Sequence, residues 1–131
     1  MTYSRCVSTR IKGNKGEDIA CRYLIKNGFK IEKRNYRKSW GELDIAAVKD
    51  NTIHFFEVKS IISDLEGLSK SHKPEENVHG LKLGHIRRVV QCYLEHTNRG
   101  LEAEFHFHVL CVFMNVHRRI ARVKWIKDIV L

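Results

Sequence analysis

Acidic and basic side chains lie on two strand-like segments, residues 42–48 and 53–59, which the sequence Lys-Asp-Asn-Thr joins. Asp50 and Asn51 tolerate the left-handed conformation that tight hairpin turns require, so we expect an antiparallel hairpin here. A two-residue loop at these positions sets the residues of the two strands directly opposite each other. The charged pairs are then Asp44 with Glu57 and Glu42 with Lys59.

Period-two alternation places these four side chains on one face of the sheet, beyond an apolar half that is nearer the turn. Opposed like charges such as Asp44 and Glu57 destabilise a strand pair. A divalent cation removes that repulsion, and two carboxylates with water suit Mg²⁺. Lys59 can then hold or deprotonate an attacking water, or stabilise a charged phosphate. The alternative is a surface hairpin with a Glu42–Lys59 ion pair, and a one-residue change in the loop would break the register.

Two helical segments add one acid and one base to this group. In residues 16–27 the apolar residues recur with helical period, and Glu17 lies on their side, an unusual place for an acid without a partner. In the second helix, residues 81–96, Lys82 lies on the same side as the apolar residues. Both charges stand near helix N-termini, where the alternative is a side chain that reaches solvent. If both face the sheet, they approach Asp44.

The other segments predict three further strands and one long loop. The strands are expected at residues 29–35, 105–113 and 120–123, the loop at residues 60–80, and a short terminal segment at residues 125–131. The order of helix, three strands, helix and two strands indicates an α/β fold, with a mixed central sheet of about five strands flanked by α-helices. With 131 residues the chain fits one domain, expected at residues 16–131 after a flexible basic arm at residues 1–15.

The charge of the chain indicates a polyanionic partner. Twenty-four Lys and Arg against fifteen Asp and Glu give a net charge of +9, which favours nucleic acid because basic side chains at phosphates release counterions. An inert basic surface and a peripheral membrane protein are the alternatives. The N-terminus lacks the apolar core of a secretory signal, and no segment approaches the ~18 apolar residues of a membrane helix. We therefore expect a cytoplasmic protein that does not bind membranes.

The cysteines do not have the spacing of a structural zinc site. Cys21, Cys92 and Cys111 lie in apolar periodic segments and are interpreted as small buried thiols.

Three sequence stretches resemble a known family. Asp44, then twelve intervening residues, then Glu57-Val58-Lys59 is similar to the PD-(D/E)XK nuclease signature. The surrounding stretches KGEDIACRYLIKNGFKIEKRNYR, GELDIAA and HFFEVKS closely resemble the YraN-like family of uncharacterised bacterial proteins, which is distantly related to archaeal Holliday junction resolvases. The resemblance is strong over residues 15–60 and looser over residues 80–113.

This resemblance implies a restriction-endonuclease-like core, a divalent cation (Mg²⁺ or Mn²⁺) and phosphodiester hydrolysis. It assigns Asp44, Glu57 and Glu17 as metal ligands, Lys59 as the catalytic lysine, and Glu42 and Lys82 as accessory residues. In one place this chain departs from the family, whose late strand reads Arg-Phe-Asp where this chain has His106-Phe107-His108. Another residue of this chain must therefore do what that aspartate does in the family. A histidine metal pair is one interpretation, and two half-exposed strand histidines is the one we favour.

Basic and aromatic residues just before the acidic hairpin can contact phosphates and stack on unpaired bases. The candidates are Arg34, Tyr36, Arg37, Lys38 and Trp40, with Lys73 in the long loop, and Arg87 and Arg88 on the polar side of the second helix. Each alone is better explained as a solvated charge, but together with the basic arm they form a plausible phosphate-binding surface.

The leading hypothesis is a Mg²⁺- or Mn²⁺-dependent endonuclease that acts on DNA, including branched or single-stranded intermediates of recombination and repair. The alternative is a nucleic-acid-binding adaptor that retains the fold without turnover. A purely structural partner-binding domain would leave the basic charge and the acidic half-face unexplained. Junction resolvases act as dimers, so the resemblance also implies a homodimer.

Overall fold

The computed structural model describes residues 9–63, 80–115 and 117–131. Its elements, in chain order, are α1 (Thr9–Lys26), β1 (Lys30–Lys38), β2 (Gly41–Lys49), β3 (Thr52–Ser63), α3 (Leu83–His96), β4 (Phe105–Asn115) and β5 (Ile120–Ile126). The predicted order of helices and strands is therefore confirmed.

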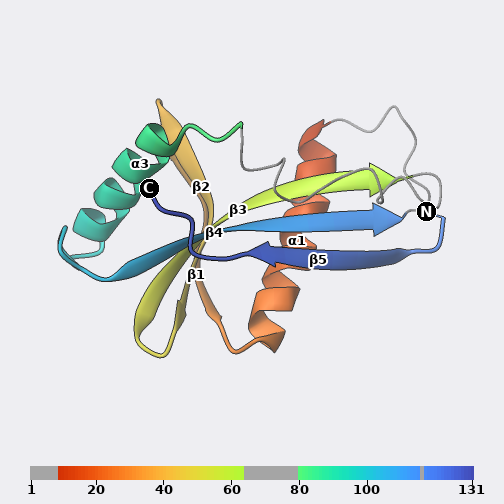
Figure 1. The fold of residues 1–131 in the computed structure, drawn as a ribbon, viewed down its shortest axis with the longest axis horizontal. Helices are drawn as coiled ribbons and strands as arrows, with labels where there is room; N and C mark the ends of the chain where they lie inside the picture. Colours follow the sequence, from red (N-terminus) through yellow and green to blue (C-terminus); the bar gives the residue numbers. More distant parts are fainter. Residues whose placement is uncertain (1–8, 64–79, 116) are drawn as a thin grey trace.

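The strands form one five-stranded sheet in the order β1-β2-β3-β4-β5 (Figure 1). β1, β2 and β3 pair antiparallel, β3 and β4 pair parallel, and β5 returns antiparallel to β4. A parallel neighbour requires a crossover connection, and α3 belongs to the one between β3 and β4. The mixed α/β sheet predicted from the sequence is confirmed.

The two helices cover opposite faces of the sheet (Figure 1). On one face, the α3 residues Val89 and Val90 pack against Phe55 and Phe107. On the other, Leu24 of α1 packs in a second cluster with residues of β2, β3 and β4. Two separate apolar layers therefore pack the sheet between the helices. This packing fixes the positions of residues on neighbouring strands relative to one another.

The turn between β2 and β3 has the predicted two-residue loop. Asp50 and Asn51 have φ values of 52° and 64°, the left-handed conformation that a type I′ turn requires at both central positions. The strand partners follow the predicted register, with Val48 opposite Ile53 and Ala46 opposite Phe55. This ladder ends at Ile45 and Phe56, one pair before the predicted Asp44–Glu57 pair.

Several element boundaries differ from the prediction. α1 begins at Thr9, within the segment predicted as an arm. The prediction missed this part of the helix because residues 9–15 lack the apolar period that identifies the rest. β3 continues to Ser63 because it pairs with β4 as far as Asn115, a partner that local sequence does not reveal. Residues 64–79 of the predicted loop lie outside the described residues, as does Lys73.

Within the described ranges, no helix combines the length and apolar character that crossing a membrane requires. The thiols of Cys21 and Cys111 are buried, as predicted, whereas that of Cys92 is partly exposed. The interpretation of Cys92 as a fully buried thiol is therefore wrong.

Candidate functional site

Asp44 lies at the point where the main-chain ladder between β2 and β3 stops. Its side chain is buried, and its Oδ2 atom accepts a hydrogen bond from the backbone N–H of Val58 at 2.8 Å. The carboxylate of Asp44 thus accepts the bond that a main-chain carbonyl of β2 would accept from β3 in a regular ladder. This contact fixes the side chain of Asp44 between the two strands.

The same contact changes which face each residue of β2 occupies. Leu43 and Ala46 both belong to the core under α3, whereas Ile45 belongs to the core under α1. Strict alternation would place Leu43 with Ile45, so the period-two pattern slips by one residue around Asp44. The predicted arrangement of all eight hairpin side chains on one face is therefore wrong at this end of β2.

Asp44 and Glu57 nevertheless lie close enough to share a side-chain hydrogen bond. Burial, followed by the negative charge of Glu57, raises the pKa of Asp44 to about 7. Burial also raises the pKa of Glu57, and the ammonium of Lys59 partly opposes that rise. Two adjacent carboxyl groups whose pKa values are both raised repel each other when ionised, and a cation between them removes that repulsion.

Lys59 follows Glu57 on β3, and its Nζ atom lies 3.5 Å from Glu57 Oε1. Both residues line a cavity of about 320 Å³. The Glu57 side chain is 17% exposed and that of Lys59 is 39% exposed, so both side chains of β3 are accessible from the cavity. The ammonium is thus placed where it can meet a phosphate or a water that enters.

Glu17 lies on the buried side of α1, as its spacing predicts. Burial, followed by the charge of Asp44, raises its pKa, and Arg34 and Asn35 oppose that rise. Arg34 approaches Glu17 Oε1 only to 3.7 Å, and among the described residues this oxygen has no hydrogen-bond partner. A buried carboxylate oxygen without a donor is costly, and a cation or a water that it coordinates would supply the missing partner.

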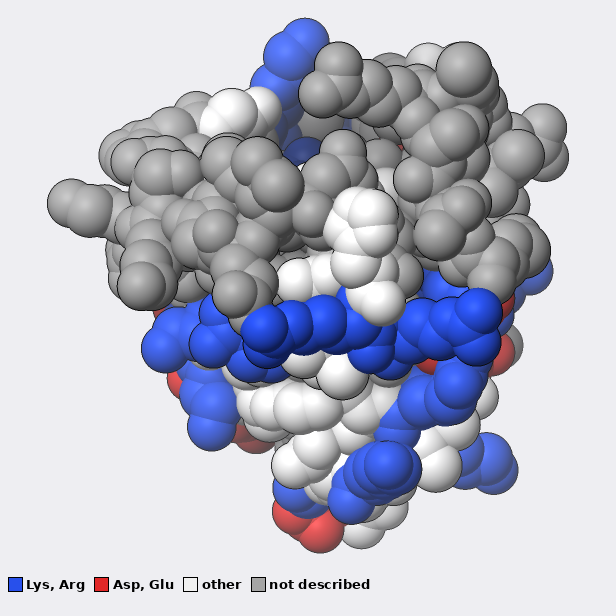
Figure 2. Space-filling view, turned by 90° about the vertical axis from the view of Figure 1, so that its right-hand side faces the viewer, with Lys and Arg blue, Asp and Glu red and all other residues white. Residues whose placement is uncertain are grey.

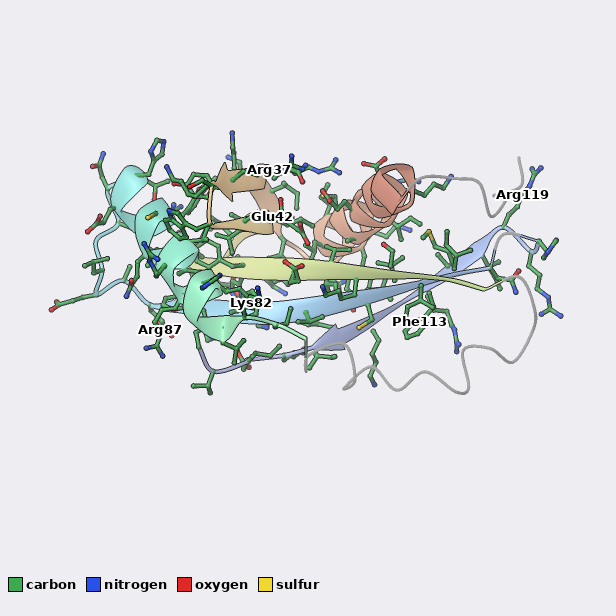
Figure 3. The ribbon with its side chains drawn as sticks, turned by 90° about the horizontal axis from the view of Figure 1, so that it is seen from above. Arg37, Glu42, Lys82, Arg87, Phe113 and Arg119 are labelled. Atoms are coloured by element: carbon green, nitrogen blue, oxygen red, sulfur yellow. The ribbon has the colours of Figure 1, made fainter. Side chains whose placement is uncertain are left out.

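Glu42 does not pair with Lys59 as predicted. It lies opposite Arg37 of β1, and Arg37 Nε contacts Glu42 Oε2 at 3.0 Å on an exposed surface. Figure 3 shows these two side chains together at the end of the β1–β2 hairpin. Glu42 also lines the same cavity as Glu57, so it contributes negative charge at the cavity wall and forms its ion pair with β1 rather than with Lys59 of β3.

The N-terminus of α3 forms the opposite wall of the cavity. Lys82 is the N-cap residue, but it makes no side-chain capping bond, and the first turn contains no acid. Lys82 and His85 both line the cavity, and Figure 3 shows Lys82 at the beginning of the helix. The partial positive charge of a helix N-terminus favours anions, so this wall suits a phosphate group.

Gly41 lets this helix approach the sheet closely. A Cβ atom at position 41 would lie 2.7 Å from Cγ2 of Val89, which is shorter than a van der Waals contact. The neighbouring Trp40 lines the cavity, and the guanidinium of Arg88 lies 4.2 Å from the centroid of its ring. Gly41 therefore sets the distance between the hairpin and α3 that defines the cavity.

The residues predicted to contact nucleic acid have different surroundings. Tyr36 is buried against Tyr93, so the prediction that it stacks on bases is wrong. Arg34 is held by Asp18 at 2.9 Å, whereas Lys38 is exposed, with its Nζ atom 5.4 Å from the Tyr36 ring centroid. Arg87 and Arg88 are exposed on α3, as predicted.

Sequence reasoning missed His85 and Gly41 as parts of the cavity wall. His85 follows Lys82 by three residues, the spacing of one helical face, and this signal could have grouped the two residues. Gly41 has no local signal, because its contact with Val89 joins segments that are far apart in sequence.

A histidine cluster lies at another edge of the sheet, away from this cavity. His54, His106 and His108 stack with ring centroids 4.8–6.0 Å apart. His108 is fully buried and bonds to His54 at 2.9 Å, so the expectation of two half-exposed histidines holds for His106 only. His106 contacts Asp128 at 2.8 Å, and these bonds keep the late strand tied to the chain after β5.

The described residues contain no group of three or more His, Cys, Asp or Glu side chains arranged to hold a metal ion. The three-carboxylate convergence expected for Glu17, Asp44 and Glu57 is thus absent as a complete ligand shell. The donor set still fits Mg²⁺ or Mn²⁺, because Mg²⁺ commonly takes one or two carboxylates and completes its shell with water. Asp44 and Glu57 provide that pair, and the unpartnered Glu17 oxygen faces the negative charge of Asp44.

Two solved structures share a distant likeness. A crystal structure of an XisH family protein from Nostoc punctiforme aligns with a TM-score of 0.39 and 18% identity, over 85% of this chain and 98% of that chain. The structure of Pyrococcus furiosus SfsA in complex with Ca²⁺ aligns with a TM-score of 0.39 and 17% identity, over 94% of this chain and 64% of that chain.

Sequence comparison identifies much nearer relatives. A protein of Campylobacter jejuni is 36% identical over 106 residues, which cover 81% of this chain and 87% of the relative. A protein of Caldicellulosiruptor bescii is 34% identical over 116 residues, which cover 88% and 93%. Both are named only as UPF0102 proteins. Residues 16–122 match the same family as a whole, so the resemblance to YraN-like proteins is confirmed and the chain belongs to the uncharacterised protein family UPF0102.

Proposed function

We propose that this protein is a divalent-metal-dependent endonuclease that hydrolyses phosphodiester bonds in DNA. The observation that carries the proposal is the buried Asp44 carboxyl, whose pKa burial and the adjacent Glu57 raise to about 7, with the ammonium of Lys59 3.5 Å from that Glu57. Glu57 and Lys59 line the cavity, and a buried acid with a strongly shifted pKa next to a cavity is typical of functional sites. The spacing of these three residues also matches the nuclease signature that the family resemblance implies.

Each residue has a separate task in this proposal. A bound Mg²⁺ or Mn²⁺ ion would activate water and neutralise charge on the scissile phosphate. Asp44 and Glu57 would hold the cation, and Val58 N–H keeps the Asp44 carboxylate oriented. Glu17 would add negative charge beside Asp44. Lys59 stabilises negative charge that develops on the phosphate, and Lys82 at the start of α3 holds the phosphate from the opposite wall.

The charge distribution supports a polyanionic substrate. Figure 2 shows a band of Lys and Arg side chains across one end of the molecule. Arg118, Arg119 and Arg122, just before and at the start of β5, are exposed, and Figure 3 shows Arg119 at the far end from α3. The chain as a whole carries a net charge of +9. Such a surface favours the long, regularly charged backbone of DNA over a small substrate.

The test is cleavage of branched, single-stranded and duplex DNA with Mg²⁺ or Mn²⁺. We expect Asp44→Ala and Glu57→Gln to reduce cleavage to background and Lys59→Ala to reduce it by about 10²–10³-fold, as for loss of a group that stabilises transition-state charge. Glu95→Gln, an exposed acid of α3, is the matched control and should retain activity. Cleavage that survives Asp44→Ala at the wild-type rate would contradict the proposal.

The band of Lys and Arg side chains in Figure 2 also fits one competing function, because binding of phosphates needs no metal. In that case the protein binds nucleic acid as an adaptor and has no turnover. Titration calorimetry with Mn²⁺ separates the two, because the adaptor would bind DNA in a salt-sensitive way without binding the metal. Metal binding that disappears in Asp44→Ala would exclude the adaptor.

A further inference from the structure

Trp40 forms the wall of the cavity on the side of the β1–β2 turn, and Arg88 of α3 lies over its ring. The guanidinium lies 4.2 Å from the centroid of the indole ring, so the ring is held in place from the helix side. Trp40 also lines the cavity together with Glu57 and Lys59. Part of an aromatic surface therefore faces the same space as the proposed catalytic residues.

This wall is built to stay rigid. Trp40 packs at the margin of the α3-side core, and Gly41 after it permits close contact with Val89. An indole with few rotatable bonds that is already ordered loses little entropy when a ligand stacks on it. A role limited to filling the core would not require the ring to border the cavity.

The size of the cavity limits what can enter. Its volume is about 320 Å³, at the lower end of the range of about 300–1,000 Å³ for sites that enclose small ligands. A base pair within a duplex cannot enter such a space, whereas a single nucleotide that has left its stack can, as in enzymes that flip bases. The cavity therefore has room for one unpaired nucleotide but not for a stacked base pair.

The charges around the cavity match the rest of a nucleotide. Lys59 and Lys82 stand on two sides of the space, and the α3 N-terminus beside Lys82 has no acid in its first turn. Glu42 on the rim is paired with Arg37, which limits its repulsion of a phosphate. The aromatic wall and the two ammonium groups therefore suit, respectively, the base and the phosphate of one nucleotide.

We infer that the cavity receives one unpaired nucleotide, with its base stacked against Trp40 and its phosphate between Lys59 and Lys82. The preferred substrate class is then DNA that offers an unpaired base at the cleavage position, such as a single strand, a flap or an open branch. This inference rests on the proposed function for its catalytic meaning, but the stacking contact itself can be measured without catalysis.

The binding experiment uses intrinsic fluorescence in the absence of metal. The chain contains two tryptophans, and Trp125 packs on the other face of the sheet, so Trp125→Phe leaves Trp40 as the single reporter. We expect a short oligothymidylate to quench this fluorescence and to bind at least about tenfold more tightly than a blunt duplex of equal length, as one base–aromatic stack provides. An oligothymidylate with abasic sites should quench little.

Substitutions of Trp40 provide the matched comparison. Trp40→Ala should weaken binding of the oligothymidylate by about tenfold and leave duplex binding unchanged, whereas Trp40→Phe should retain most of the affinity. Unfolding temperatures of both variants check that the fold is kept. Equal binding of single strand and duplex by the wild type, or a Trp40→Ala variant that binds both as before, would overturn the inference.

The failure of this inference and that of the proposed function are distinguishable. If DNA is cleaved in an Asp44-dependent way but Trp40→Ala cleaves single strands and duplex as the wild type does, the stacking site is refuted and the nuclease stands. If no DNA is cleaved but the oligothymidylate quenches Trp40 selectively, the stacking site stands and the nuclease is refuted.

Discussion

Asp44 Oδ2 and the backbone N–H of Val58 are 2.8 Å apart, at the position where β2 and β3 stop pairing through their main chains. A side chain that replaces a main-chain acceptor is held by the sheet itself and cannot rotate toward solvent. Asp44 therefore remains buried beside Glu57 even though both are acids. The arrangement sacrifices stability of the metal-free protein to keep two carboxyl groups together.

Replacing Asp44 by Asn should stabilise the metal-free protein above neutral pH. The folded pKa of about 7 is higher than that of an unfolded Asp. The stability that the Asp44 carboxyl contributes is therefore fully present below pH ~4 and is lost as the pH rises to ~7. The amide of Asp44→Asn would keep the bond to Val58 and could donate to Glu57. We expect a gain on the order of a few kcal/mol at pH 8 and little gain at pH 4, measured by urea unfolding in EDTA.

A variant that is no more stable than the wild type at pH 8 would contradict the buried, proton-sharing pair. Glu95→Gln should show no such pH-dependent difference, because Glu95 is exposed on α3.

Metal binding should release a proton below neutral pH. Asp44 holds a proton at pH values under about 7, and carboxylate ligands must be deprotonated to bind a metal. The apparent affinity for Mn²⁺ should therefore fall as the pH decreases from 8 to 6, by up to about tenfold for each unit. Calorimetry in buffers of different ionisation enthalpy should detect close to one proton released at pH 6 and few at pH 8. An affinity that does not depend on pH would show that Asp44 is not a ligand.

The turn and the register of the β2–β3 hairpin could be predicted from the sequence, but the position of Asp44 at its other end could not. Asp50 and Asn51 determine the turn through their own backbone preferences, and the register from Val48 to Ile45 follows from it. The slip at Asp44 depends instead on a bond to Val58 of the neighbouring strand. Alternation rules contain no information about a side chain that enters the ladder.

The sequence pattern also does not predict burial by residues that are far away in the sequence. Tyr36 lies in a stretch of basic residues, which predicts an exposed ring, but α3 places Tyr93 against it. The prediction that Glu17 lies on the buried side of α1 is confirmed, because helical spacing alone determines its face. Spacing predicts the face of an element, whereas the packing of two elements decides what that face contacts.

Introducing a Cβ atom at Gly41 should move α3 away from the hairpin. In Gly41→Ala the new atom would approach Val89 Cγ2 to 2.7 Å, and such overpacking costs about 1–3 kcal/mol. Urea unfolding should show this loss. Gly84→Ala is the matched control, because its Cβ would meet nothing within 4 Å, and it should leave stability unchanged or slightly raised.

A double-mutant cycle with Val89→Ala tests the cause of that loss. Removing the Val89 methyl groups opens the space that the new Cβ needs, so Gly41→Ala should cost less in the Val89→Ala background than in the wild type. Additive effects of the two substitutions would show that the loss arises elsewhere.

Acid should destabilise the protein through His108. The backbone N–H of Asp128 donates to His108 Nδ1 at 3.0 Å, so the remaining ring hydrogen is on Nε2 and points to His54 Nδ1 at 2.9 Å. Both rings are therefore neutral in the folded protein. Burial, followed by the neighbouring His54, lowers the pKa of His108 to about 4, and a proton added at Nδ1 would face the Asp128 N–H.

Because this folded pKa is depressed, the stability that His108 contributes is present above pH ~6.5 and is lost as the pH falls to ~4, by on the order of 3 kcal/mol. Asp44 acts in the opposite direction over part of this range, so the measurement must be a difference between variants. We expect the stability of His108→Gln relative to wild type to rise as the pH decreases from 7.5 to 4.5. His106→Gln, at a partly exposed ring of the same cluster, is the comparison variant. Parallel stability curves for wild type and His108→Gln would mean that His108 takes up its proton in the folded protein as readily as in the unfolded chain.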